Sequence, residues 1–207
     1  MNRKLGILCM VLGMILMLGA GLLYMNNSRD NINAQESAKD TLSVLEQQLQ
    51  DGANGSSANT LELLKPVELL TEEEKKMTEV TINGVAYIGY LSIPSLALEL
   101  PITADWSYQL LRKSPCRYYG TVRGEDLVLM AHNYASHFGK ISQLESGDSV
   151  VFTDMDGVTT YYEVVGKDIL VPTAVSEMTS GDFDLTLFTC TYGGEYRVTV
   201  YCDKADA

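Results

Sequence analysis

An uninterrupted apolar run near the N-terminus limits most strongly what this chain can fold into. Residues 5–25 are 21 consecutive uncharged, mostly apolar residues. At about 1.5 Å of rise per residue, a helix of that length crosses the roughly 30 Å hydrocarbon layer of a bilayer. Arg3 and Lys4 precede the run, so the positive-inside rule predicts residues 1–4 in the cytoplasm and the rest of the chain on the extracellular face.

A secretory signal peptide is the alternative explanation of this run. A cleaved signal has a shorter apolar region that ends at small residues. The best candidate for such a cleavage site, Leu18-Gly19-Ala20, still lies inside the run. We therefore predict an uncleaved, single-pass membrane anchor at residues 5–25.

Composition and charge exclude several classes of function. The chain has 207 residues, of which 46% are hydrophobic and 20% charged, as is usual for a globular protein. Its 27 acidic residues outnumber 15 basic ones, giving a net charge of -12, so we expect no nucleic-acid partner. Two histidines, and four cysteines without a Cys-x-x-Cys pair, offer no zinc site. We therefore expect neither a metal nor a cofactor, and Asp154, Asp156 and Glu163 lack the spacing of a calcium-binding loop.

The cysteines allow at most one disulfide in the folded part of the chain. Cys9 lies inside the apolar run, where a partner from a folded domain could not reach it. A bridge between Cys116 and Cys202 is the pairing that remains for consideration. We expect instead that both are core or edge thiols.

Residues 26–77 are predicted to form a stalk. Apolar residues recur in its first part at intervals of three and four, which is the period of an amphipathic helix; they are Ala34, Ala38, Leu42, Leu45 and Leu49. The Gly-, Ser- and Asn-rich residues 51–60 predict a flexible linker. Residues 61–76 are either a short helix packed loosely on the following domain or more spacer.

Residues 78–207 have the pattern of a mainly β domain. Asn83-Gly84 and Asp156-Gly157 each join two strand-like segments and predict hairpins. The alternation of Leu96, Leu98, Leu100 and Ile102 predicts a strand near Pro94 and Pro101, and brief helical segments are expected near Asp105 and over 138–144. Seven or eight strands with almost no helix imply a small closed or nearly closed barrel.

The segment 186–200 carries the most specific chemical signal. If Gly193 and Gly194 are the central residues of a tight turn, strand partners have numbers that sum to 387, so Cys190 faces Arg197 across a hairpin. A guanidinium beside a thiol favours a thiolate or the oxyanion of a tetrahedral adduct. This pairing predicts a cysteine nucleophile.

A nucleophile of this kind also needs a group that moves protons. His132 closes a strand over 127–132, whereas His137 lies in the following loop. A side chain at the end of a strand is held more firmly than one in a loop, and catalysis needs that positioning. We predict His132 as the acid–base residue and His137 as a loop residue near the cleft.

These residues resemble the sortase family. Thr186-Leu187-Phe188-Thr189-Cys190 fits the Thr-Leu-x-Thr-Cys pattern of sortases, Arg197 follows on the next strand, and Ala131-His132-Asn133 resembles their histidine motif, although Gly is common where Ala131 stands. The Ile93-Pro94 strand start is also similar. The resemblance covers residues 80–207 and the N-terminal anchor.

The resemblance implies a fold and an activity. Sortases are membrane-tethered cysteine transpeptidases with an eight-stranded barrel, found mostly in Gram-positive bacteria. They cleave a C-terminal sorting signal similar to Leu-Pro-x-Thr-Gly and transfer the protein to an amine of the cell wall or of a pilin. Cys190, His132 and Arg197 would be catalytic, and Thr189 would contact the substrate or orient Arg197, unless its hydroxyl only satisfies a backbone group.

The class of sortase is suggested by what the sequence lacks. It has no second apolar span after Cys202 and no Asp-Pro-aromatic lid, and the short link before residue 185 is too small for a long inserted helix. A housekeeping-type or class D-like enzyme is therefore expected. Two alternatives remain open, which are a thiol endopeptidase that only hydrolyses and a non-catalytic, membrane-tethered β-domain.

Overall fold

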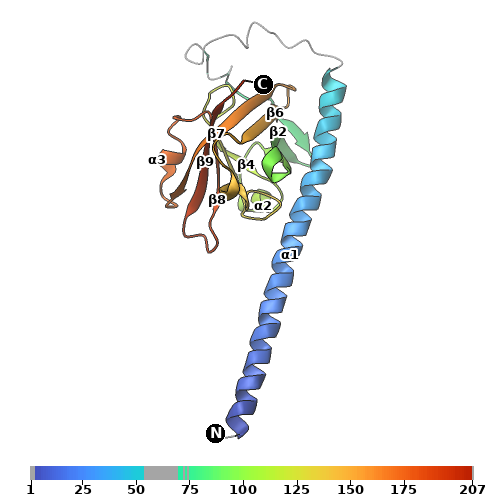
Figure 1. Ribbon diagram of the computed structural model, residues 1–207. Coiled ribbons are helices and arrows are strands. Elements are labelled where there is room, and N and C mark those ends of the chain that lie inside the picture. The colour runs from blue at the N-terminus through green and yellow to red at the C-terminus, as the bar shows by residue number, and fades with distance from the viewer. Residues whose placement is uncertain (1–2, 54–69, 72, 74, 207) are drawn as a thin grey trace.

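A β-barrel and one long helix make up the computed structural model, which describes residues 3–53, 70–71, 73 and 75–206. Helix α1 (Arg3–Ala53) is continuous. Its first half extends away from the barrel and its second half lies beside it (Figure 1). The linker expected at 51–60 lies mostly outside the described residues, as does the segment 61–76.

Nine strands among the described residues form one sheet. They are β1 (Val80–Ile82), β2 (Val85–Ile93), β3 (Leu98–Thr103), β4 (Cys116–Tyr119), β5 (Leu127–Ala131), β6 (Ser149–Asp154), β7 (Thr159–Leu170), β8 (Leu185–Cys190) and β9 (Arg197–Lys204). The short helical elements are η2 (Pro94–Leu96), α2 (Tyr108–Leu111), η3 (Ile141–Gln143) and α3 (Val175–Met178).

The sheet closes into the eight-stranded barrel that the sequence predicts. The strand order is β2-β3-β4-β5-β8-β9-β7-β6, and β6 pairs with β2 to complete the circle. Strand β1 is an additional short strand paired to β2. Two pairs are parallel, β3 with β4 and β5 with β8, and the others are antiparallel.

Barrel closure depends on a glycine where β2 meets β6. Gly89 has a φ of 149°, and a Cβ at this position would collide with the backbone of Thr153 and Asp154 on β6. The backbones of the two strands can therefore approach closely only because no side chain lies between them.

Both predicted hairpins are present, whereas two details of the strand prediction are wrong. Asn83 and Gly84 have the positive φ angles, 51° and 79°, of a two-residue hairpin turn. Leu96 is not in a strand, because Pro94 begins the 3-10 turn η2 and β3 starts only at Leu98. Strand β4 was not predicted, since its four residues, CRYY, show no clear alternation.

The amphipathic stripe in α1 packs on the barrel. Ala34, Ala38, Leu42 and Leu45 are buried, and Ala38 belongs to the main barrel core. In this region α1 lies against β3. The helix predicted from this spacing is thus confirmed, and this part of residues 26–77 is packed against the barrel.

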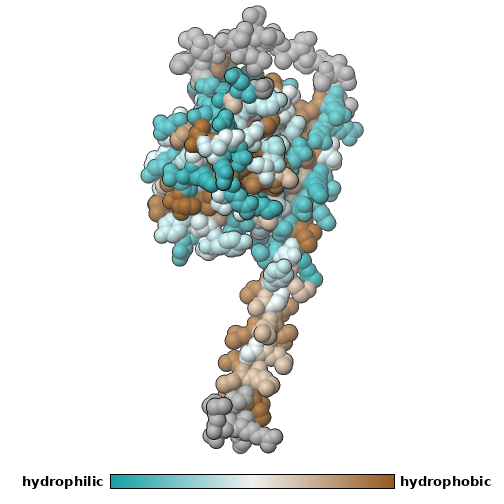
Figure 2. All heavy atoms as spheres, viewed as in Figure 1, coloured by the Kyte–Doolittle hydropathy of each residue, from teal (hydrophilic) through white to brown (hydrophobic). Residues whose placement is uncertain are grey.

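The first half of α1 presents apolar side chains to its surroundings (Figure 2). This helix is long and apolar enough to cross a membrane. Its most apolar stretch has a mean hydropathy of 2.4, and 0% of that stretch is buried. Exposing an apolar surface of this length to water is unfavourable in free energy, and burial in a bilayer would remove that exposure.

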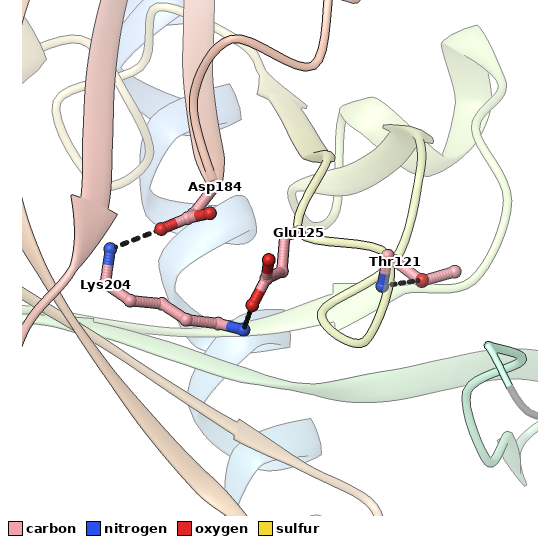
Figure 3. Close-up of polar contacts among 5 residues, drawn as sticks. Thr121, Glu125, Asp184 and Lys204 are labelled. Carbon is pink, nitrogen blue, oxygen red and sulfur yellow. Dashed lines mark hydrogen bonds and ion pairs between the residues drawn. The ribbon is translucent and has the colours of Figure 1, made fainter. Parts of the chain in front are cut away.

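A polar cluster joins three strands at one end of the barrel (Figure 3). The backbone N–H of Lys204 donates to the Asp184 carboxylate at 2.7 Å, and its Nζ meets Glu125 at 2.5 Å. These residues adjoin the start of β5, the start of β8 and the end of β9. Because the ion pair is exposed, we expect it to contribute no more than about 1 kcal/mol.

Candidate active site

The hairpin between β8 and β9 pairs Cys190 with Arg197, as predicted. The turn itself is longer than the two residues expected. Thr191 and Tyr196 still pair, through an N–H to carbonyl bond of 3.0 Å, so four residues form the loop. The extra residues are added equally on both sides of Gly193 and Gly194, which both have positive φ, and the predicted register is therefore retained.

Strand alternation places Cys190 on the outer face of the barrel. Leu185 and Leu187 point into the main core, whereas Phe188 belongs to a separate outer cluster with Val128 of β5. Cys190 is two residues beyond Phe188 and so shares its face. Arg197, directly opposite Cys190 in an antiparallel pair, lies on the same face.

His132 reaches the same end of the barrel through a parallel strand pair. In the register of β5 and β8, Ala131 is the partner of Thr189. His132 and Cys190 are the next residues of the two neighbouring strands, whose backbones lie about 4.8 Å apart. Cys190, His132 and Arg197 thus converge at the ends of three adjacent strands.

Thr189 fixes this register. Its side chain is buried, and its hydroxyl donates to the Ala131 carbonyl at 2.8 Å. The bond ties β8 to β5 one residue before Cys190 and His132. The hydroxyl therefore has a backbone partner, which was one of the expectations from sequence, while a contact between Thr189 and substrate stays a prediction.

The guanidinium of Arg197 is anchored by the hairpin loop. Its Nη1 donates to the carbonyls of Gly194 and Tyr196, each at 3.1 Å. A guanidinium has five N–H donors in a planar arrangement, so donors remain for an anion at the site. The loop thus fixes the guanidinium of the residue that pairs with Cys190 in the hairpin.

Cys116 and Cys202, the other two cysteines of the barrel, are poor nucleophiles. Cys116 and Cys202 are buried thiols without a disulfide, so the structure does not contain the bridge considered from sequence. Burial raises the pKa of Cys116 to about 11 and that of Cys202 to about 12. Cys190 is the partly exposed thiol of the barrel.

The two histidines have different environments. His132 is partly exposed, and its pKa is lowered by burial and by the nearby cation of Arg112. Its ring stacks on Tyr134 with centroids 4.8 Å apart. At neutral pH the His132 imidazole is therefore mostly neutral and ready to accept a proton.

His137 lies in the loop after β5, as predicted, and its ring is 5.5 Å from that of Tyr134. It is 0% exposed, and neither ring nitrogen has a hydrogen-bond partner among the described residues. Burial, followed by the charge of His132, lowers the pKa of His137 to about 4. Its burial was not predicted, because the sequence does not show that this loop folds inward.

This burial predicts a pH-dependent stability. A histidine in an unfolded chain titrates near pH 6.5, so the unfolded state binds the proton first and the folded state loses stability as the pH falls from 6.5 through 4. We expect His137 to account for about 3 kcal/mol of that loss. Urea unfolding followed by the fluorescence of Trp106, the single tryptophan, measures it. In His137→Phe the loss should shrink by this amount, and equal losses in both proteins would contradict the prediction.

Sequence reasoning missed two neighbours of His132. Tyr134 stacks on the imidazole, and the amide of Asn133 donates to the Thr191 carbonyl at 3.5 Å, linking the loop after β5 to the loop after β8. Asn133 was noted only as part of the histidine motif. The stacking of Tyr134 depends on a turn that its sequence does not reveal.

A cysteine acyl-transfer enzyme needs a thiol nucleophile, a group that moves protons and a donor that stabilises the oxyanion. Residues with a thiol, an imidazole and a guanidinium lie together at one end of this barrel. A model of the sortase domain matches residues 91–205. The chain therefore belongs to the sortase family of cysteine transpeptidases. No curated protein matches the chain by sequence.

Solved structures of sortases share the fold. Clostridium perfringens sortase C with the C-terminal cell wall sorting motif is 25% identical, with a TM-score of 0.61 over 82% of this chain and 100% of that one. Sortase C1 from Streptococcus suis is 28% identical, with a TM-score of 0.52 over 58% of this chain and 74% of that one. The sortase D5 transpeptidase of Clostridium perfringens is 16% identical, with a TM-score of 0.59 over 83% and 99%, and it supports the fold alone.

Proposed function

We propose that Cys190, His132 and Arg197 perform the transpeptidation of this sortase. The observation that carries the proposal is the strand register, which pairs Cys190 with Arg197 and Ala131 with Thr189. This register supports the proposal because the three residues stand at neighbouring strand ends, at one end of the barrel. The lowered pKa of His132 keeps its imidazole neutral at neutral pH, and a neutral imidazole is the form that can accept a proton.

The first half of the reaction cleaves the substrate. The Cys190 thiol gives its proton to the neutral His132 imidazole, and the thiolate attacks the scissile carbonyl carbon. Arg197 and backbone N–H groups stabilise the oxyanion that forms. The carbon–nitrogen bond then breaks, the departing amine takes the proton from His132, and the acyl group remains on Cys190 as a thioester.

The second half transfers the acyl group. An entering amine attacks the thioester carbonyl and gives one proton to His132. Collapse of the adduct releases the Cys190 sulfur, which is reprotonated from His132. The product contains a new amide bond, and the enzyme returns to its starting state.

The substrates proposed are exported proteins that end in a sorting signal similar to Leu-Pro-x-Thr-Gly, cleaved after the Thr. The acceptor is an amine of a cell-wall peptidoglycan precursor or of a pilin. A housekeeping-type or class D-like role is retained, because the link between β7 and β8 contains only the one-turn helix α3 (Val175–Met178). Thr189 would then support the substrate site from the barrel side.

The placement in the cell follows from the apolar half of α1. We propose that residues 1–4 lie in the cytoplasm, residues 5–25 cross the membrane, residues 26–77 connect the two parts, and residues 78–207 form the catalytic domain on the extracellular face. The exposed apolar surface of α1 and Arg3 and Lys4 before the apolar run support this orientation.

The test uses the full chain in detergent micelles, a peptide containing a Leu-Pro-x-Thr-Gly sequence, and triglycine as the amine. Mass spectrometry should detect a ligated product that depends on triglycine. Cleavage without ligation would indicate a thiol endopeptidase that only hydrolyses. Neither product, with a panel of related peptides, would favour the non-catalytic β-domain and reject the proposal.

A further inference from the structure

Helix α1 contacts the barrel beside the active site as well as over the core. Asn31 lies three residues before Ala34, so it continues the buried stripe formed by Ala34 and Ala38. The barrel residue that it meets is Ser136, in the loop between β5 and η3. The helix that carries the apolar run therefore touches the loop that contains both histidines.

Three polar contacts join Asn31 and Ser136. The Asn31 side-chain oxygen accepts from the Ser136 backbone N–H at 3.1 Å and from the Ser136 hydroxyl at 2.9 Å. The same hydroxyl also lies 3.2 Å from the Asn31 carbonyl. A hydroxyl has a single proton, so these last two contacts alternate, whereas the bond from the backbone N–H persists.

Hydrogen bonds within the loop connect the segment around Ser136 to His132. The N–H groups of His137 and Gly139 both donate to the Tyr134 carbonyl at 2.9 Å, and Phe138 donates to the His132 carbonyl at 3.2 Å. Ser136 thus lies inside a compact hydrogen-bonded turn. The Tyr134 ring at the start of this turn stacks on the His132 ring, with an interplanar angle of 27°.

We propose that Asn31 is a positioning residue for the active site, holding the His132 imidazole in place through Ser136 and the stacked ring of Tyr134. The inference rests on the proposed role of His132. It makes α1 a structural part of the catalytic site in addition to its role as an anchor, since the contact comes from the segment just after the apolar run.

The charged and titratable groups around His132 indicate how its pKa would change if the imidazole were held less firmly. Arg112 beyond α2 acts on both His132 and Tyr134, Asp30 of α1 acts on Tyr134, and His137 lies in the same loop. Cys190 and Arg197 face the site from β8 and β9. Burial is the largest influence on His132, so a looser ring would gain water and its pKa would rise toward the ordinary value.

The experiment replaces Asn31 with Ala in the full chain in detergent micelles. Alanine favours helix, so α1 should stay intact, which circular dichroism can verify. We expect kcat for peptide transfer to fall about tenfold, as a small misplacement of a catalytic group would cause, with KM unchanged within about twofold. Because the chain has two histidines, NMR titration can follow both, and the pKa of His132 should rise.

Matched variants test the interpretation. Asn33→Ala changes the same residue type at an exposed position on α1 and should leave kcat and the His132 titration unchanged. Ser136→Ala removes the two hydroxyl contacts and should have a smaller effect than Asn31→Ala. The double variant should be only slightly worse than Asn31→Ala, since it additionally loses just the bond from the Ser136 hydroxyl to the backbone carbonyl of residue 31.

Two outcomes separate this inference from the proposed function. If the wild-type enzyme transfers no acyl group, the proposed function fails, while the His132 titration still reports on the Asn31 contact. If Asn31→Ala matches Asn33→Ala in both kcat and the pKa of His132, the positioning role is wrong whether or not the enzyme is active.

Discussion

Replacement of Cys190 by Ala is expected to abolish transpeptidation and to leave no thioester with a sorting peptide. The reaction then has no nucleophile, because the other barrel thiols, Cys116 and Cys202, are buried and have raised pKa values of about 11 and about 12. Loss of a covalent nucleophile typically costs at least about 10³-fold in rate. Intact-mass measurement of the acylated enzyme, together with the rate of ligated product, provides the test.

The matched control is Cys9→Ala, which removes an exposed thiol from α1. It should form the thioester and turn over at the wild-type rate. The fold of Cys190→Ala should also be preserved, since the residue lies at the partly exposed end of β8. Undiminished turnover in Cys190→Ala would reject both the transpeptidase and the hydrolase interpretations.

Replacement of Arg197 by Lys is expected to lower kcat by about 10² to 10³-fold, the usual cost of losing an oxyanion donor. Lysine keeps the charge but lacks the planar set of donors that can bind two loop carbonyls and an anion together. KM should change much less than kcat, because the interaction is strongest in the transition state. Steady-state kinetics with the sorting peptide and triglycine measures both constants.

The control for Arg197 is Arg123→Lys, the same exchange in the loop between β4 and β5, at the end of the barrel that carries the polar cluster. This variant should retain wild-type kinetics. An Arg197→Lys enzyme with wild-type kcat would show that charge alone suffices. A large rise in KM at constant kcat would instead assign Arg197 to substrate binding.

The arrangement around Cys190 could be predicted because local rules determine it. In an antiparallel hairpin, the residue numbers of every pair have the same sum. A turn that gains one residue on each side of Gly193 and Gly194 keeps that sum, so Cys190 still pairs with Arg197. The hairpin at Asn83-Gly84 is equally local. In both cases neighbouring residues in sequence carry the whole signal.

Other features depend on contacts between distant segments and could not be predicted in this way. Strand β4 (Cys116–Tyr119) is a strand because β3 and β5 flank it. The burial of His137 depends on the turn that follows β5. The stripe in α1 predicted a helix but not its partner, since an amphipathic face does not identify what covers it.

Because α1 is continuous, it limits how far the barrel can lie from the apolar run. Asn31 is six residues beyond the apolar run, a rise of about 9 Å at 1.5 Å per residue. In Figure 1 the loop joining β8 and β9 lies at the end of the barrel nearer the N-terminus of α1. In the proposed topology, with residues 5–25 embedded in lipid, the catalytic end would stand close above the headgroups. The enzyme would then meet chains still leaving or held in the bilayer before proteins farther from the membrane.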